Sequence, residues 1–200
     1  MGLNPEPTYF KQQVREILKH LPDAKESTKL PLIVAVSGFG GSGKSTLAGA
    51  LKEQLESADI VSMDAFIVDR LQVRSADWEG FDRERFREQV LEPASRGETI
   101  NFGEYDWIAN KILRQKSIFP LPKYLILEGC SILHPDLVEY YDFSVWIDCP
   151  LEVATQRGMA RDRSYSVDHD DLWLNVWMPN ERDYYEKVHP DKLASYILSN

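Results

Sequence analysis

The sequence predicts an α/β fold in which a parallel sheet is covered by helices on both faces. Three observations indicate this fold: the apolar runs are short and continuous, segments of helical periodicity alternate with them, and glycine or acidic residues follow them. Continuous apolar runs are typical of strands that are buried on both faces, and helical crossovers join such strands in parallel. Because ligands bind at the carboxyl ends of parallel strands, we expect a site where these runs end.

The first half of the chain contains the clearest predicted elements. Apolar residues recur at helical spacing over 8–21, and Pro22 ends this amphipathic helix. After a polar linker over 23–29, the continuous run Leu32–Val36 predicts a strand that is buried on both faces. The elements predicted next are a helix marked by Leu47, Leu51 and Leu55, a short strand over 60–63 that ends at Asp64, and a polar loop or lid over 66–82.

The second half of the chain continues the alternation of strands and helices. Two further strands, Tyr124–Leu127 and Phe143–Ile147, are followed directly by Glu128 and Asp148. The other predicted elements are a helix marked by Phe86, Val90 and Leu91 that stops near Pro93, a helix that starts at Pro150 and carries Arg157, Arg161 and Arg163, a helical stripe from Trp173 to Val188 that is interrupted at Pro179, and a weak last strand, Tyr196–Leu198.

Length and composition predict one globular domain over residues 1–200. A content of 43% hydrophobic and 28% charged residues excludes a disordered or fibrous chain. The net charge of −9 argues against non-specific binding of nucleic acids or membrane surfaces, and no apolar run is long enough to span a bilayer. Two cysteines, Cys130 and Cys149, supply neither a zinc cluster nor a disulfide framework and favour a cytoplasmic location. The sequence leaves open whether the chain forms a homo-oligomer.

The segment Gly38–Ser45 matches the phosphate-binding pattern G-x-x-x-x-G-K-[ST] between a predicted strand and a predicted helix. Glycines let backbone N–H groups turn toward a polyphosphate, and the helix adds the positive end of its dipole. Lys44 is expected to reach the β- and γ-phosphates and Ser45 to hold Mg²⁺, so we predict a P-loop NTPase fold that uses ATP and Mg²⁺. The residues predicted to bind the nucleotide are Gly38, Gly40, Gly41, Ser42, Gly43, Lys44, Ser45 and Thr46.

Acidic residues at the predicted strand ends supply the other groups that phosphoryl transfer needs. Asp64 is the candidate base that takes a proton from the phosphate acceptor, or it shares the metal ion. Its alternative role is to cap the next turn. Glu128 and Asp148 compete as the metal-site acid, and we favour Glu128 because Gly129 after it leaves the site open, whereas Pro150 starts a helix two residues after Asp148.

Arginines and aromatic residues complete the predicted site. Arg157 and Arg161 share one helix face and are candidates to cover the transferring phosphate from a lid at about 157–170. Their alternative is a solvated face that pairs with the neighbouring acids. The aromatic residues Trp78, Tyr105 and Trp107 are candidates to face the acceptor, whereas Trp173 and Trp177 are expected in the core.

The order of these motifs resembles that of uridine kinases and their relatives, a group that includes phosphoribulokinase and bacterial-type pantothenate kinase. The matching segments are Gly38–Thr46, Met63–Phe66, Gly80–Asp82, Glu104–Trp107, Leu127–Gly129 and Arg157–Asp162. The resemblance implies that Asp64 is the catalytic aspartate, with Phe66 beside it on the substrate side. It also implies metal-site positions at Ser45 and Glu128 and lid arginines at Arg157 and Arg161. Tyr105, Asp106 and Trp107 match an acceptor-side Tyr-Asp-Phe motif, with Trp107 in place of the phenylalanine.

Several departures from the uridine kinase pattern fall where the acceptor would be recognised. Ile67 stands where a tyrosine is usual, and Asp77-Trp78-Glu79 replaces a His-Pro-Asp. Asn110 and Ile112 stand near the places of a histidine and an arginine. Because a site that binds its acceptor by hydrogen bonds discriminates strongly through such groups, these departures put uridine itself in doubt as the acceptor.

The sequence therefore predicts an ATP- and Mg²⁺-dependent phosphotransferase that acts on an alcohol group of a small metabolite, such as a nucleoside, a sugar or a pantothenate-like acid. In this reading Lys44, Asp64, Arg157 and Arg161 are catalytic. One alternative is a P-loop NTPase switch that acts through a protein partner, although residues 110–113 lack the final aspartate of a GTPase Asn-Lys-x-Asp motif. Another alternative is a nucleotide-binding protein without kinase activity.

Overall fold

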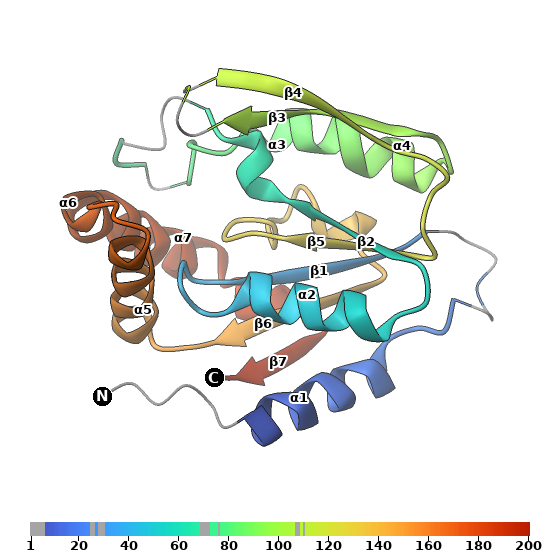
Figure 1. The fold of residues 1–200 in the computed structure, drawn as a ribbon, viewed down its shortest axis with the longest axis horizontal. Helices are drawn as coiled ribbons and strands as arrows, with labels where there is room; N and C mark the ends of the chain where they lie inside the picture. The colour runs from blue at the N-terminus through green and yellow to red at the C-terminus, as the bar shows by residue number, and fades with distance from the viewer. Residues whose placement is uncertain are drawn as a thin grey trace.

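A computed structural model describes residues 7–24, 27, 31–68, 73–75, 77–106, 109 and 111–200. Five strands form one parallel sheet in the order β2-β5-β1-β6-β7, as Figure 1 shows. This arrangement confirms the predicted parallel α/β fold. The strands are β1 (Leu32–Gly38), β2 (Ala58–Ser62), β5 (Tyr124–Glu128), β6 (Phe143–Asp148) and β7 (Tyr196–Ser199).

The central strand β1 is buried along its whole length, and its side chains alternate between two hydrophobic cores. Ile33 lies opposite Leu125 of β5 in the register, and both belong to one core. Val34 lies opposite Phe143 of β6, and both belong to the core on the other face. The continuous apolar run that predicted this strand therefore covers both faces of the sheet.

Two helices cover the second of these faces. α1 (Pro7–His20) contributes Val14 and Ile17 to that core, and α2 (Lys44–Gln54), which follows β1, contributes Leu47 and Leu51. The amide of Gln13 in α1 donates a hydrogen bond to the backbone oxygen of Ser199 at 2.6 Å and so joins α1 to β7.

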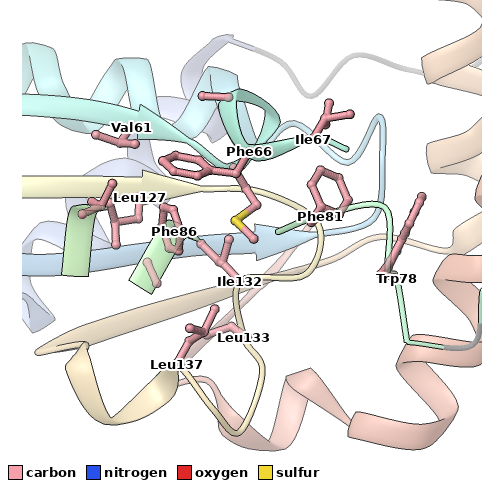
Figure 2. Packing of buried hydrophobic residues seen from close by; sticks show 14 of the residues in the cluster. Val61, Phe66, Ile67, Trp78, Phe81, Phe86, Leu127, Ile132, Leu133 and Leu137 are labelled. Atoms are coloured by element: carbon pink, nitrogen blue, oxygen red, sulfur yellow. The ribbon is translucent and has the colours of Figure 1, made fainter. Parts of the chain in front are cut away.

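The opposite face is covered by a helical segment that continues farther than expected. α3 (Arg83–Phe86), the π-helical turn η3 (Arg87–Leu91) and α4 (Glu92–Ser95) follow one another without a break. The segment ends at Ser95, two residues beyond the predicted stop near Pro93. Figure 2 shows the core that this segment closes, with Phe86 packed near Phe66 and Leu127.

An antiparallel hairpin that was not predicted lies outside the main sheet. It consists of β3 (Ile100–Asp106) and β4 (Lys111–Ile118), with an irregular register between Glu104 and Tyr105. Figure 1 shows the hairpin beside α3 and α4. The ring of Phe102 in β3 stacks on that of Phe66, with 5.5 Å between their centroids. Phe66 belongs to η1 (Met63–Phe66), the short helix after β2.

The C-terminal helices lie at the edge where the parallel strands end (Figure 1). The predicted interruption at Pro179 is wrong, since Pro179 falls in the first turn of α7 and the chain stays helical through it. Within the described ranges, no helix combines the length and apolar character that a membrane span requires. The remaining elements are η4 (Val138–Tyr140), α5 (Leu151–Ser164), α6 (Asp170–Leu172), the π-helical turn η5 (Trp173–Trp177), α7 (Met178–Val188) and α8 (Pro190–Leu193).

Candidate active site

A cavity of about 560 Å³ opens beside the glycine loop, at the carboxyl ends of β2 and β5. A larger cavity of about 780 Å³ shares Phe81 with it but contains no residue of that loop, so the smaller cavity is the candidate site. It brings together residues from the loop, the strand ends and the C-terminal helices. The lining residues are Gly40, Gly41, Lys44, Ser45, Asp64, Trp78, Phe81, Glu128, Cys130, Arg161, Asp162, Tyr165, His169, Trp173, Trp177 and Glu181.

The glycine loop has a backbone that only glycine adopts readily at two positions. Gly41 and Gly43 have φ values of 82° and 103°, in the left-handed region. At Gly41 a Cβ atom would lie 2.1 Å from the backbone oxygen of Ala154 in α5, so the loop packs directly against that helix. α2 begins immediately afterwards at Lys44. A loop of this kind before a helix N-terminus has the form of a phosphate site.

Lys44 is buried beneath this loop and carries its positive charge there. Its Nζ donates a hydrogen bond to the backbone oxygen of Phe39 at 2.9 Å. Burial lowers the pKa of Lys44, but Cys130 and the carboxyl groups of Glu128 and Glu181 raise it by more, so the net change is upward. The ammonium group is therefore available to bind anionic oxygens at neutral pH.

The site contains two oxygen ligands of the type that Mg²⁺ prefers. The hydroxyl of Ser45 donates a hydrogen bond to Oε2 of Glu128 at 3.4 Å, and the Glu128 carboxylate is buried. Asp148, the competing acid, is exposed and does not line the cavity. In the described part of the chain, no group of three or more His, Cys, Asp or Glu residues is placed to hold a metal ion. This donor set fits Mg²⁺, which usually takes one or two carboxylates and completes its shell with phosphate and water.

Asp64 lines the cavity from η1, the short helix after β2. The capping role is filled by Ser62, whose hydroxyl accepts from the Asp64 backbone N–H at 3.3 Å, so the Asp64 carboxylate is left for other contacts. Desolvation by the surrounding protein, and then the charge of Glu128, raise the pKa of Asp64 to about 6. Lys44 and Arg161 oppose this change. A carboxylate with this pKa is suited to accept a proton near neutral pH.

The two predicted lid arginines are placed differently. Arg161 lines the cavity, and its guanidinium donates to Oδ1 of Asp162 at 2.8 and 3.1 Å. Arg157 is not among the lining residues, and its Nη1 donates to Sγ of Cys149 at 3.5 Å. The second oxygen of Asp162 accepts from the indole N–H of Trp173 at 2.8 Å. Asp162 therefore connects Arg161 to Trp173, one of the aromatic residues that line the cavity.

Three of the acceptor-side residues suggested by the resemblance, Phe66, Tyr105 and Asp106, do not line this cavity. Phe66 is fully buried and packs against Phe86 and Phe102 in the core, under the guanidinium of Arg85. Tyr105 and Asp106 lie in β3 and are not lining residues. Trp107 and Asn110 lie outside the described residues.

The sequence did not predict most of the cavity-lining residues that the C-terminal helices contribute. Trp173 and Trp177 are buried as expected, but they also line the cavity, with 5.0 Å between their ring centroids. His169 and Glu181 received no role. Trp173 and Trp177 are four residues apart in an apolar stretch, a pattern that indicates a core face, and no spacing in the sequence indicates Glu181.

Among curated proteins, this chain is similar to small-molecule kinases. No family model matches the chain. A uridine kinase of Haemophilus ducreyi is 28% identical over 145 residues, which cover 66% of this chain and 67% of that protein. A pantothenate kinase of Listeria monocytogenes is 27% identical over 144 residues, which cover 62% of this chain and 47% of that protein. A solved structure described as a possible uridine kinase from Bacillus stearothermophilus has a TM-score of 0.73 at 19% identity, covering 95% of this chain and 99% of that one, and it shows the same fold.

Proposed function

We propose, from the premise that this chain is a small-molecule P-loop kinase related to the uridine kinases, that it transfers the γ-phosphoryl group of ATP to an alcohol group of a small metabolite. The observation that carries the proposal is one cavity in which the glycine loop, the Lys44 ammonium, the Asp64 carboxylate and the Ser45–Glu128 pair meet. Each of these groups has a separate task in phosphoryl transfer.

The nucleotide end of the cavity is the glycine loop. Backbone N–H groups of 38–46 and the N-terminus of α2 offer positive potential to the phosphates, and Lys44 adds a full charge. Ser45 and Glu128 are the residues that would hold Mg²⁺ in this proposal, and Asp64, which lines the same cavity, would share it. Magnesium at this place supplies charge neutralisation for the phosphate oxygens.

The acceptor end of the cavity contains the base. The Asp64 carboxylate takes the proton of the acceptor hydroxyl as the new bond forms between that oxygen and the γ-phosphorus. The bond between the γ-phosphorus and the bridging oxygen breaks at the same centre, and ADP leaves with the electron pair. Arg161, and Arg157 if the lid at about 157–170 closes over the phosphates, stabilise the charge of the transferred group.

The acceptor belongs to the class of small alcohols that includes nucleosides, sugars and pantothenate-like acids. Two free cysteines, Cys130 and Cys149, are consistent with the cytoplasmic location that forms part of this proposal. The single kinase domain, with residues 1–29 as its N-terminal helix and linker, also remains part of the proposal.

The test follows labelled phosphate from [γ-³²P]ATP in the presence of Mg²⁺ and a mixture of alcohol-bearing metabolites. Transfer of label to a small molecule by the wild type, and its loss in Lys44→Ala, is the expected result. Hydrolysis to inorganic phosphate that rises only when a protein partner is added would instead support an NTPase switch. ATP binding without any product would support a protein that binds nucleotide but transfers nothing.

A further inference from the structure

The guanidinium of Arg85 in α3 joins two other elements of the fold. Its Nη2 donates to the backbone oxygen of Ala65 in η1 at 3.1 Å, and its Nη1 donates to the backbone oxygen of Gly103 in β3 at 2.9 Å. The same guanidinium lies over the ring of Phe66, 4.5 Å from the ring centroid. Ala65 and Gly103 are 20 and 18 residues from Arg85 in the sequence, so one side chain connects η1, α3 and the hairpin.

The next carbonyl group of η1 is held by the residue that caps α3. The Asp82 backbone N–H donates to the oxygen of Phe66 at 2.8 Å, and the Asp82 carboxylate accepts from the Arg85 backbone N–H at 2.9 Å. Figure 2 shows the rings of Phe66 and Phe86, which join the same two elements, packed near each other. Two successive carbonyl groups of η1 are therefore bonded to the first residues of this helical segment.

The place of the Arg85 guanidinium is unfavourable for a charge on its own. The side chain is 15% exposed, and burial lowers the pKa of Arg85 against the opposing effect of Asp82. The ion pair with Asp82 measures 3.6 Å between Nε and Oδ2, whereas the two bonds to main-chain oxygens are shorter. A planar guanidinium can bind two separate carbonyl oxygens at once, and a lysine ammonium cannot reproduce this geometry.

The turn that Arg85 holds carries the candidate base. Asp64 directly precedes Ala65 in η1 and lines the cavity, while Met63 on its other side is fully buried. The place of the Asp64 carboxylate therefore depends on how this short turn is held. A base must lie within hydrogen-bond reach of the hydroxyl that it deprotonates, and a misplacement of about 1 Å can lower the rate about 10²-fold.

From these contacts we infer that Arg85 is a positioning residue for phosphoryl transfer: its bonds to η1 and β3 fix the turn that presents the Asp64 carboxylate to the acceptor hydroxyl. The inference rests on the proposed kinase function and adds to it a residue that does not line the cavity. It also gives the hairpin a task, because β3 supplies the second oxygen that holds the guanidinium in place.

The inference is tested by Arg85→Met, which keeps an unbranched side chain and removes the guanidinium. The single-turnover rate of transfer from [γ-³²P]ATP to the metabolite that takes up label in the assay of the proposed function should fall by about 10- to 100-fold. The affinity for MgATP, measured by calorimetry, should change less than about 2-fold. Arg87→Met is the matched control, because Arg87 follows on the same helical segment and pairs with the exposed Glu84. It should keep the transfer rate within about 2-fold of the wild type.

Repeating the change in Asp64→Asn separates positioning from a merely structural role. If Arg85 acts through Asp64, then Arg85→Met should slow the residual transfer of Asp64→Asn by less than about 3-fold. An equal fold-loss in both backgrounds overturns the inference and leaves the proposed function standing. Arg85→Lys should transfer more slowly than the wild type and faster than Arg85→Met, and it carries the same test if Arg85→Met does not fold.

A second measurement needs no substrate. In Arg85→Met, amide hydrogen exchange across Met63–Phe66 should become faster by about 10-fold or more, since η1 loses a hydrogen bond from a charged group, and exchange in β1 and β5 should stay within about 2-fold. Unchanged exchange across Met63–Phe66, or an equal increase in β1 and β5, overturns this inference alone. Absence of transfer by the wild type overturns the proposed function and, with it, the role of Arg85 in transfer.

Discussion

The carboxylate of Glu181 accepts a hydrogen bond from the backbone N–H of Gly40, with 2.6 Å between Oε1 and the nitrogen. Glu181 is 2% exposed, and its carboxylate also interacts with the thiol of Cys130. Burial raises the pKa of Glu181 against the opposing effects of Lys44 and the Gly40 N–H. A carboxylate oxygen of the protein therefore accepts the hydrogen bond of one backbone N–H in the phosphate-binding loop. An anionic ligand would otherwise be favoured at that N–H.

Glu181→Gln should bind ATP about 3- to 10-fold more tightly than the wild type at pH 8, because it removes a negative charge beside the triphosphate and keeps an oxygen that accepts from Gly40. Isothermal titration calorimetry without Mg²⁺ measures this change directly. Glu152→Gln removes a charge from an exposed position on α5 and serves as the matched control. Weaker ATP binding by Glu181→Gln would show that the carboxylate supports the loop instead of competing for it.

The carboxyl group of Asp64 should titrate near pH 6 in the free protein, since its surroundings and the charge of Glu128 raise its pKa to about 6. In Glu128→Gln the repulsion is absent, so the midpoint should move to lower pH. Carbon-13 NMR of labelled aspartate carboxyl groups measures both midpoints. The Glu152→Gln variant should leave the midpoint where it is. A midpoint that does not move in Glu128→Gln would mean that the two carboxylates are not close enough to interact.

Gly41→Ala should destabilise the protein by about 2–4 kcal/mol, because alanine is strained at positive φ and its Cβ would meet backbone atoms of α5. Gly49→Ala is the matched control within α2, where an added Cβ meets nothing within 4 Å. That change should stabilise the protein by about 0.5–1 kcal/mol. Urea unfolding gives both values. Equal stability of the two variants would contradict the close approach of the loop to α5.

Asp162→Ala should lower the free energy of unfolding by about 1–3 kcal/mol, since it leaves the buried indole N–H of Trp173 without an acceptor. Burial raises the pKa of Asp162, but hydrogen bonds from Trp173 and Arg161 lower it by more, so the net change is downward from 3.8. The stabilisation is therefore present above pH 3.8 and is lost as the pH falls through the folded-state pKa.

Urea unfolding of Asp162→Ala at several pH values should thus show a difference from the wild type that is full at pH 7 and shrinks in acid. The control is Asp148→Ala, which changes an exposed aspartate that does not line the cavity. It should leave the free energy of unfolding within about 0.5 kcal/mol of the wild type. A difference for Asp162→Ala that is independent of pH would argue against an ionised, hydrogen-bonded carboxylate at this position.

The parallel sheet could be predicted because burial on both faces makes each central strand a continuous apolar run. The hairpin β3–β4 could not, since few of its residues, such as Ile100 and Phe102, are buried, and the same strands carry exposed charged pairs such as Lys116 with Glu104. Local pattern is weak in a strand of this kind, and the packing of the hairpin on η1 decides its structure.

Site residues could likewise be predicted where the order of strands places them, and could not where tertiary packing does. Lys44 follows the glycine loop after β1, Asp64 lies in η1 just after β2, and Glu128 ends β5, so the topology alone brings them to one edge. Glu181 and Trp173 reach the cavity from helices whose approach depends on tertiary packing. The motif that contains Asp64 also placed Phe66 on the substrate side, but the turn of η1 directs that ring into the core.

The central claim, that Asp64 takes the acceptor proton, is tested most directly by comparing MgATP binding and phosphoryl transfer in Asp64→Asn. The variant keeps the size of the side chain and removes the base, so calorimetry should give an affinity for MgATP within about 3-fold of the wild type. The rate of transfer to the preferred acceptor should fall by about 10²- to 10⁴-fold, the range typical of a lost general base. Transfer at the wild-type rate by Asp64→Asn would contradict the account.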